Sequence, residues 1–439
     1  MGRRGGIEMT GPGGKSPGER PRRVLLSDRD PRSLLASFLA LITEPLDIIL
    51  IDPGTPGFEV RRIIDQLEPD RIQLTDDLPP EGRTVPVDLA TGPKLARVLI
   101  QTGGTTGNPR FAIHTWETLL AAAAGFCRAF PGPAHSLCVL PLWHVGGLMQ
   151  LIRALITEAR FDLADWKAVE AGTARPDREG AFLSLVPTQL HRLLEEPTAA
   201  GWLRQFRAIF LGGAAAWPAL LERARDEGIP LAPAYGMTET AAQVCCLKPD
   251  EFLSGRSGAG RALPHARLSV VDRNEQPVPT GKAGRIRIES KSLFLGYEGE
   301  PDRRGDRYVT SDLGSMDDHG YLTIWGRSDD AINTGGEKVM PTEVETAIRA
   351  IGLVEDVVVC GRPDPEWGEI VCALVVSSRF PGEIEAQRQL ADLLASHKIP
   401  RRWVLIEKVP RNALGKLDRT RVADLMGMND DQERNRRDS

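Results

Sequence analysis

The first tract that could perform chemistry is a loop of glycine and threonine residues, TGGTTGNPR, at positions 102–110. It follows an apolar run at 98–100, which predicts a strand. Glycines allow successive backbone N–H groups to turn toward one anion, and threonine hydroxyls add donors, so the loop suits a polyphosphate. The Walker A spacing is absent. Taken alone, the loop could equally be a structural turn.

A second tract, AYGMTET at positions 234–240, joins an aromatic ring, a hydroxyl and a carboxylate within five residues. Tyr235 could cover a nucleobase, Thr238 could bond a phosphate oxygen, and Glu239 could hold Mg²⁺. The alternative is that Tyr235 belongs to the core and that Glu239 is a solvated helix residue.

Three later positions carry charged side chains beside glycines. Asp312 and Arg327 lie at predicted strand ends, where a carboxylate can accept the protons of both ribose hydroxyls, although surface turns have the same composition. Lys416 ends the tract PRNALGK near the C-terminus. A single lysine at such a place is usually a solvated charge.

With these tracts in this order, the chain resembles the superfamily of adenylate-forming enzymes, which includes acyl-CoA synthetases, nonribosomal adenylation domains and luciferases. The resemblance covers about residues 95–420 and rests on TGGTTGNPR, YGMTETA, SDLG, GRSDD and PRNALGK. It implies an acid–thiol ligase that uses ATP, Mg²⁺ and CoA. The implied catalytic residues are Lys416, Glu239, Thr238 and His144. The implied nucleotide-binding residues are Thr102, Gly103, Gly104, Thr105, Thr106, Gly107, Arg110, Gly213, Tyr235, Gly236, Asp312, Arg327 and Asp329, with Mg²⁺ on Glu239.

The resemblance also assigns roles. Tyr235 would stack on adenine, Thr238 would touch the α-phosphate, and Asp312 would bind the ribose hydroxyls with Arg327 nearby. Asp329 would be the pivot of a moving C-terminal domain, whose Lys416 would bridge the acyl carboxylate and the phosphate.

The loop departs from the family pattern at three positions. Gly103 replaces the common serine, Arg110 the common lysine, and Phe111 the following glycine. Arg110 keeps the positive charge. Phe111 is expected to put a bulky ring where the family has a flexible loop residue, and to slow loop movement.

The acid is expected to lie between residues 140–150, 186–190 and 211–214, with His144 at the pocket mouth or, alternatively, as a structural histidine. These segments resemble those of CoA ligases in menaquinone and phylloquinone biosynthesis, whose acid carries a second carboxylate and a keto group. Arg153 and Thr188 are candidates to bind it, although Arg153 could be a solvated helix residue. A protein that loads another acid onto CoA or a carrier protein, and a non-catalytic adenylate-binding protein, are the rival interpretations.

The elements that must position these residues form an α/β fold. Short apolar runs such as 48–51 alternate with helix-length segments at 34–43, 116–128 and 187–195, which favours parallel strands with crossover helices. Closely spaced strands after residue 255 predict a small barrel-like subdomain. A last α+β domain should hold helices at 342–351 and 387–396. The predicted domains are a disordered leader at 1–21, an adenylate-forming domain at 22–327, a mobile C-terminal domain at 328–426 and a charged tail at 427–439.

Composition limits the other possibilities. The 60 acidic and 55 basic residues give a net charge of -5, which argues against a nucleic-acid binder. The six cysteines have no C-x-x-C spacing, and no apolar run is long enough to span a membrane. We therefore expect a cytoplasmic protein with small-molecule partners, no membrane span and no nucleic acid.

Overall fold

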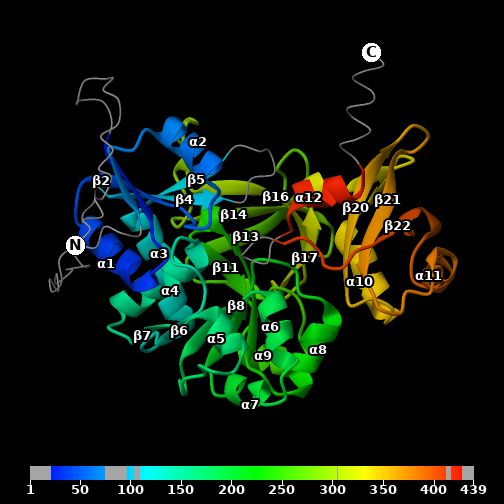
Figure 1. Ribbon diagram of the computed structural model, residues 1–439, viewed down its shortest axis with the longest axis horizontal. Helices are drawn as coiled ribbons and strands as arrows, with labels where there is room; N and C mark the ends of the chain where they lie inside the picture. The colour runs from blue at the N-terminus through cyan, green and yellow to red at the C-terminus, as the bar shows by residue number, and fades with distance from the viewer. Residues whose placement is uncertain (1–20, 75–95, 103–108, 304, 412–416, 428–439) are drawn as a thin grey trace, which may run out of the picture.

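The computed structural model describes residues 21–74, 96–102, 109–303, 305–411 and 417–427. Within these ranges the predicted α/β fold is confirmed, with four sheets between layers of helices. The N-terminal elements lie at one end of the molecule and the C-terminal elements at the other, and the strands of the 136–262 region lie below those between the two ends (Figure 1). The candidate residues that the structure describes lie in or beside the first three sheets and in the 3-10 helix that precedes the fourth.

The first sheet has the strand order β15-β5-β4-β2-β1-β3. Its β1, β2, β3 and β4 run parallel, and β5 and β15 are antiparallel additions. The strands are β1 (Arg22–Ser27), β2 (Leu46–Leu50), β3 (Arg71–Leu74), β4 (Arg97–Thr102), β5 (Arg110–Thr115) and β15 (Gly296–Tyr297). The helices of this part are α1 (Pro31–Leu41), α2 (Gly57–Leu67) and α3 (Trp116–Ala129).

The second sheet has the order β12-β11-β10-β9-β8-β6-β7, parallel from β7 to β10. Its strands are β6 (Ser136–Cys138), β7 (Phe161–Leu163), β8 (Phe182–Leu185), β9 (Ala208–Leu211), β10 (Leu231–Met237), β11 (Ala242–Cys246) and β12 (Arg261–Ala262). Its helices are α4 (Val145–Ile156), α5 (Trp166–Glu170), α6 (Pro187–Leu194), α7 (Ala199–Leu203), α8 (Pro218–Asp226) and α9 (Pro249–Leu253). The three-residue 3-10 helix η1 (Thr238–Thr240) joins β10 to β11.

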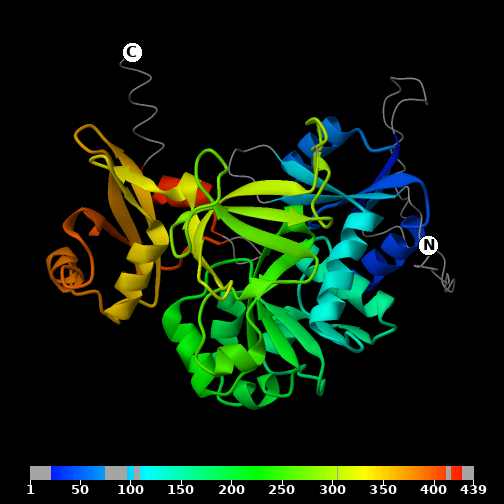
Figure 2. The same cartoon turned by 180° about the vertical axis from the view of Figure 1, so that it is seen from behind.

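The third sheet is antiparallel, as the closely spaced strands after residue 255 predict. It comprises β13 (Ala266–Val271), β14 (Gly284–Ser290), β16 (Arg307–Met316) and β17 (Leu322–Arg327). From the opposite side, this sheet lies between the N-terminal and the C-terminal elements (Figure 2). Asp312 lies inside the ten-residue strand β16, beside a register shift at Leu313/Gly314, and not at a strand end as expected. The shift locally breaks the regular pairing with β17, which makes the tract resemble a strand end.

The fourth sheet has the order β19-β18-β21-β20, with β22 paired to β21. Its strands are β18 (Ile332–Thr334), β19 (Glu337–Val339), β20 (Asp356–Asp364), β21 (Gly368–Val376) and β22 (Arg402–Leu405), with helices α10 (Pro341–Ala350), α11 (Glu383–Leu390) and α12 (Arg419–Leu425). The short helices η2 (Ser328–Asp330) and η3 (Ser396–Lys398) complete this part. The proposed domain boundary at 327/328 falls between β17 and η2.

Two expectations about local structure are wrong. The helix expected at 387–396 is α11, which ends at Leu390 because the chain then tightens into turns in which Leu393 N–H bonds the Leu390 carbonyl at 2.9 Å. Phe111 is not a loop residue. It lies in β5 with 0% of its surface exposed, packed with Leu25, Ile49 and other apolar residues of the first sheet. Its ring fills the core of the first sheet.

Candidate nucleotide site and acid pocket

The structure distributes the predicted site residues over several elements. Gly103, Gly104, Thr105, Thr106, Gly107 and Lys416 lie outside the described residues. Thr102 ends β4 and Arg110 begins β5; His144 precedes α4, and Gly213 follows β9 with a φ of 79°. Tyr235 and Gly236 belong to β10, Thr238 and Glu239 to η1, Asp312 to β16, Arg327 to β17 and Asp329 to η2.

Tyr235 and Asp312 are brought together across two sheets. The Tyr235 hydroxyl donates to Asp312 Oδ2 at 2.6 Å, and the Tyr235 ring is 9% exposed within an apolar cluster that includes Val244 and Ile286. Burial raises the pKa of Asp312, although the Tyr235 hydrogen bond opposes this. The interpretation of Tyr235 as a core residue is confirmed, and its hydroxyl supports a carboxylate that could face ribose. Its stacking on adenine stays a prediction.

The junction between the third and fourth sheets is charged. Arg327 pairs with Asp329 and lies 4.0 Å from Asp312, measured from Arg327 Nη1 to Asp312 Oδ1. Asp330 pairs with Arg419 of α12. Thr342 of α10 donates to the Trp325 carbonyl at 2.6 Å. The candidate ribose-binding carboxylate and the candidate pivot thus share one arginine.

The turn that carries Thr238 and Glu239 requires a close backbone approach. A Cβ on Gly236 would lie 2.1 Å from the Ala242 carbonyl oxygen, so only glycine fits this position. The Thr240 hydroxyl lies 3.0 Å from the Met237 nitrogen, from which it accepts a hydrogen bond. The glycine in YGMTET is therefore needed to shape the turn.

Glu239 has a partner that the sequence did not indicate. The Tyr297 hydroxyl donates to Glu239 Oε1 at 2.6 Å. Arg110 lies over the Tyr297 ring at 3.7 Å and pairs with Glu300 at 2.8 Å. Glu239 and Arg110, predicted from separate tracts, thus contact one tyrosine, Glu239 at the hydroxyl and Arg110 over the ring.

Sequence reasoning missed Tyr297, Tyr308 and His114. Tyr297 and Tyr308 both pack on Phe294, with ring centroids 4.8 and 5.4 Å away. The chain has only four tyrosines, and Tyr235 is the third that gathers here. The small number of tyrosines could therefore have marked Tyr297 and Tyr308 as candidate site residues. His114 bonds the Thr238 carbonyl from β5, and nothing in its local sequence pointed to this contact.

Arg153 is not a solvated helix residue. It is 4% exposed, its Nη2 donates to Gln243 Oε1 at 2.8 Å, and its guanidinium lies 4.1 Å from the centre of the Phe126 ring. Among the described residues, no carboxylate lies within ion-pair distance of it. Burial lowers the pKa of Arg153 to about 10, so the group remains charged at neutral pH.

His265 extends this buried polar cluster. Its ring occupies the space beside Gly125, where a Cβ would lie 1.9 Å from Nδ1. Burial, helped by the charge of Arg153, lowers the pKa of His265 to about 4. Four buried atoms here have no hydrogen-bond partner among the described residues: Arg153 Nε, Gln243 Nε2 and both ring nitrogens of His265. Such a group in a folded protein indicates a ligand or ordered water.

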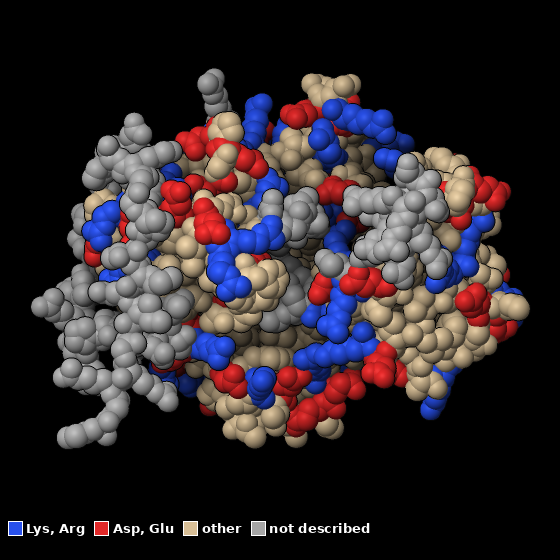
Figure 3. Space-filling model, turned by 45° about the horizontal axis from the view of Figure 1, so that its top comes forward, with Lys and Arg blue, Asp and Glu red and all other residues tan. Residues whose placement is uncertain are grey.

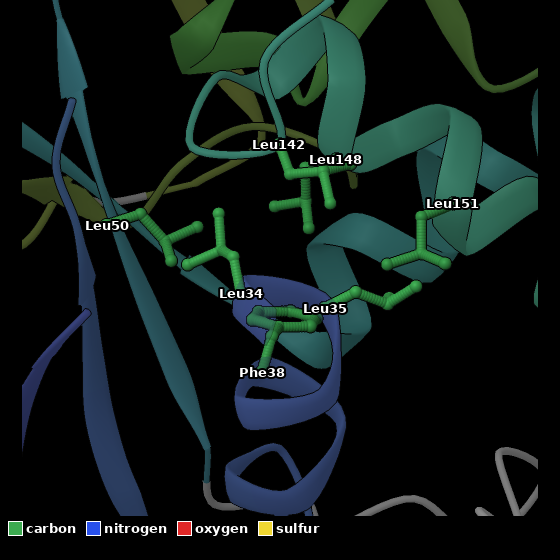
Figure 4. A pocket seen from close by; sticks show the side chains of 7 residues that line it. All are labelled: Leu34, Leu35, Phe38, Leu50, Leu142, Leu148 and Leu151. Carbon is green, nitrogen blue, oxygen red and sulfur yellow. The ribbon is translucent and has the colours of Figure 1, made fainter. Parts of the chain in front are cut away.

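The polar cluster differs from the apolar void on the other side of α4. That void measures about 10 Å³ and is lined by Leu34, Leu35, Phe38, Leu50, Leu142, Leu148 and Leu151, which point toward it in Figure 4. It has room for about one water and offers no polar partner, so it is a core packing defect. The polar cluster at Arg153 and Gln243 is the better candidate for the acid pocket. Gln243 follows the end of η1 by three residues, which keeps this cluster close to the candidate nucleotide residues.

The surface charge agrees with a small-molecule enzyme. Acidic and basic side chains are interspersed over the face shown in Figure 3, with no broad surface of one sign. None of the helices in the described ranges combines the length and the apolar character needed to cross a membrane. All six cysteines are free, and burial raises the pKa of Cys138 and Cys246 to about 12.

Glu239 lies beside Tyr297, Asp312 is supported by the buried Tyr235, and Gly236 shapes the turn that follows it. This arrangement fits the nucleotide site that the motifs of the adenylate-forming class predict. The chain belongs to the AMP-binding enzyme family, whose model matches residues 24–298, and the model of the AMP-binding enzyme C-terminal domain matches residues 343–416. The resemblance deduced from the motifs is therefore confirmed.

Named relatives are similar over most of the chain. A 2-succinylbenzoate–CoA ligase of Enterococcus faecalis is 31% identical over 331 residues, which cover 74% of this chain and 68% of the relative. A ligase of the same name from Bacillus anthracis is 32% identical, covering 75% of this chain and 70% of its own.

Solved structures have the same fold. The o-succinylbenzoate CoA synthetase (MenE) of Bacillus subtilis, in complex with the acyl-adenylate intermediate OSB-AMP, is 23% identical, with a TM-score of 0.77. The match covers 92% of this chain and 88% of that one. ATP-bound MatB from Rhodopseudomonas palustris is 22% identical, also with a TM-score of 0.77. That match covers 92% of this chain and 89% of the MatB chain.

Proposed function

We propose that the chain is an ATP-dependent acid:CoA ligase whose acid is 2-succinylbenzoate (o-succinylbenzoate), in menaquinone or phylloquinone biosynthesis. The observation that carries the choice of acid is Arg153, a buried guanidinium with no carboxylate partner among the described residues. The acid has two carboxylates and a ketone. One carboxylate would be activated, and the other would pair with Arg153. Because buried charges are normally paired, this pocket suits a diacid better than a monoacid.

The nucleotide would be ATP with Mg²⁺. Glu239 suits this metal, because Mg²⁺ is commonly held by one or two carboxylates plus substrate phosphates. Bound Mg²⁺ would neutralise charge on the phosphates. Asp312, supported by Tyr235, would accept the ribose hydroxyls, and Thr238 would contact the α-phosphate. These assignments agree with the pairing of Tyr297 to Glu239 Oε1, which orients that carboxylate.

The reaction would run in two steps. A carboxylate oxygen attacks the α-phosphorus, the bond to the bridging oxygen breaks, and pyrophosphate leaves. The CoA sulfur then attacks the acyl carbon, AMP leaves, and the thiol proton passes to solvent. Lys416 would serve the first step, and rotation about Asp329 would move it away for the second.

We also propose a cytoplasmic location. Free, buried thiols such as Cys138 and Cys246 are typical of proteins that fold in a reducing compartment. The substrates ATP and CoA are consistent with that compartment.

ATP–pyrophosphate exchange tests the choice of acid. The substrates are 2-succinylbenzoate and two analogues that each lack one carboxylate, 4-oxo-4-phenylbutanoate and 2-butanoylbenzoate. The diacid should be favoured by roughly 10²-fold or more, because a site built around a polar group rejects analogues that leave it unpaired. Arg153→Gln should remove most of this preference while leaving exchange with the active monoacid within about threefold. Arg128→Gln, at an exposed arginine in the last turn of α3, is the matched control.

The outcomes separate the rival functions. Equal exchange with the diacid and a monoacid would refute the assignment of Arg153 and the acid. Exchange without thioester formation from CoA would favour a carrier-protein acceptor. Absence of exchange with every acid would favour a non-catalytic adenylate-binding protein.

A further inference from the structure

The turn from Met237 to Ala242, which presents Thr238 and Glu239, is held in an unfavourable backbone conformation. Ala241 and Ala242 follow η1 with φ angles of 52° and 78°. Two successive residues with a Cβ in the left-handed region are uncommon, and such positions persist only where the surroundings hold them. The turn therefore depends on contacts from outside itself.

One such contact comes from His114 of β5. Its Nε2 lies 2.7 Å from the Thr238 carbonyl oxygen, and its Nδ1 lies 2.9 Å from Thr118 Oγ1 on α3. The ring is 0% exposed. The Phe294 N–H adds a second contact, to the Glu239 carbonyl at 2.9 Å. His114 thus joins the first sheet to the turn between β10 and β11 of the second.

The neighbours of His114 fix its tautomer. A carbonyl can only accept, so Nε2 must carry the proton that Thr238 receives. Burial lowers the pKa of His114 to about 4, which leaves the ring neutral at physiological pH. Nδ1 of the neutral ring carries no proton and can only accept from the Thr118 hydroxyl, whose one proton is shared with the Thr115 carbonyl, also 2.9 Å away. The imidazole is consequently a fixed, uncharged donor directed at one backbone oxygen.

We propose that His114 is a positioning residue for adenylation, which holds the Thr238 carbonyl and thereby orients Thr238 and Glu239 toward ATP and Mg²⁺. The inference rests on the proposed function of those two side chains. The direction of the Thr238 carbonyl determines the peptide plane between Thr238 and Glu239. Loss of the His114 donor would let that peptide plane rotate. The side chains of Thr238 and Glu239 would then be present but misplaced.

Four variants separate positioning from packing. In His114→Gln the amide nitrogen takes the place of Nε2 and can still donate to the Thr238 carbonyl. In His114→Asn the shorter amide takes the place of Nδ1 and can reach only Thr118. His114→Leu removes both bonds while retaining much of the volume. Ile113→Ala is the control for lost packing. Ile113 precedes His114 on β5, so its side chain lies on the opposite face of the sheet, where it is 3% exposed and packs in an apolar cluster with Leu99 and Phe111.

Two measurements are made on the full chain. Calorimetry of ATP binding over a Mg²⁺ series needs no acid, and ATP–pyrophosphate exchange gives kcat and the KM values for ATP and acid. His114→Leu and His114→Asn should lower exchange kcat by roughly 10- to 100-fold and weaken the Mg²⁺ dependence of ATP binding, with the acid KM within about twofold. His114→Gln should stay within about fivefold of wild type. Ile113→Ala should lower the thermal midpoint but keep kcat.

The proposal is overturned if exchange kcat falls as much in His114→Gln as in His114→Asn. It is also overturned if the ratio of lost kcat to lost thermal midpoint is the same in Ile113→Ala as in the histidine variants. If His114→Leu does not fold, the Gln and Asn pair still decides. Failure of wild type to exchange with 2-succinylbenzoate would refute the acid but not this inference, because the Mg²⁺-dependent binding of ATP is measured without any acid.

Discussion

The nucleotide site and the acid pocket differ in how their polar groups are satisfied. Around the nucleotide site, Tyr235 bonds Asp312, Tyr297 bonds Glu239 and His114 bonds the Thr238 carbonyl. In the acid pocket, Arg153 Nε and both nitrogens of His265 are buried without a hydrogen-bond partner among the described residues. The first region is preorganised by its own side chains. In our proposal, the bound acid would complete the second.

This difference follows from what each region must recognise. Every acid that such an enzyme activates meets the same ATP, so the nucleotide groups can be fixed in advance by internal hydrogen bonds. The acid pocket must distinguish one acid from others, and an unpaired buried cation rejects those that lack the matching anion. Stability is given up there for specificity.

The largest expected effect concerns the nucleotide side. Lys416→Ala should reduce adenylate formation by roughly 10³-fold, as expected when a charge that stabilises the transition state is removed. Thioester formation from supplied acyl-adenylate should be largely spared, because Lys416 would serve only the first step. Single-turnover assays of both half-reactions test this, and equal loss in both would contradict the division of labour.

The next effect tests whether the Tyr235–Asp312 pair acts on ATP alone. Asp312→Asn should raise the KM for ATP by roughly 10- to 100-fold, since hydrogen bonds to a charged group contribute about 1.5–3 kcal/mol. Tyr235→Phe removes the supporting hydroxyl only and should have a smaller effect. Steady-state kinetics should give the same ratio with any acid. A change that depends on the acid would mean that the two regions are not separate.

The two buried histidines offer a third test, through pH. Burial lowers both pKa values to about 4, whereas an unfolded histidine titrates near 6.5. Between these values the unfolded state binds more protons, so stability falls as pH is lowered from 6.5 toward 4, by at most about 1.4 kcal/mol per pH unit for each histidine.

Differences between variants isolate this effect. Glu345, whose pKa burial raises to about 7, acts in the opposite sense, because its folded form keeps a proton that the unfolded form loses. His114→Gln and His265→Leu should each flatten the acid limb of chemical unfolding curves. At pH 7, His265→Leu should be the better tolerated, since the ring nitrogens of His265 have no hydrogen-bond partner to lose in the part of the chain that the structure describes. An unchanged slope in both variants would show that neither histidine is held neutral.

Much of this architecture was predictable from sequence. Runs such as 48–51 and 98–100 mark parallel strands because both faces are apolar. β4 contains the second run, and β2 contains the first except for Ile51. Tyr235, Glu239 and Asp312 were found because their tracts combine chemical types that are rarely adjacent. Phe111 and Arg153 were misjudged, because a motif position suggests a loop and an arginine suggests solvent. Only the packing shows that both are buried.

The contacts that complete the site could not be read from the chain. Tyr297 and Glu239 are 58 residues apart, and His114 and Thr238 are 124 apart. Such pairs arise where different sheets meet, and no local periodicity records that geometry. The same holds for Gln243, whose amide reaches Arg153 only because β11 passes beside α4.

The smallest expected effect sharpens the comparison from the pocket side. Arg153→Met removes a buried charge that has no carboxylate partner among the described residues, but it also leaves Gln243 Oε1 without its donor. Because the two effects oppose each other, the free energy of unfolding of the ligand-free protein should change by less than about 1 kcal/mol. The thermal midpoint in the absence of substrates should stay near that of the wild type, and the stabilisation that 2-succinylbenzoate gives to the wild type should disappear. The matched substitution on the nucleotide side, Asp312→Leu, should destabilise, since it leaves the buried Tyr235 hydroxyl with only the long 3.5 Å contact to the Thr310 hydroxyl. If Arg153→Met were as destabilising as Asp312→Leu, the pocket cation would have a structural role and the contrast between the regions would fail.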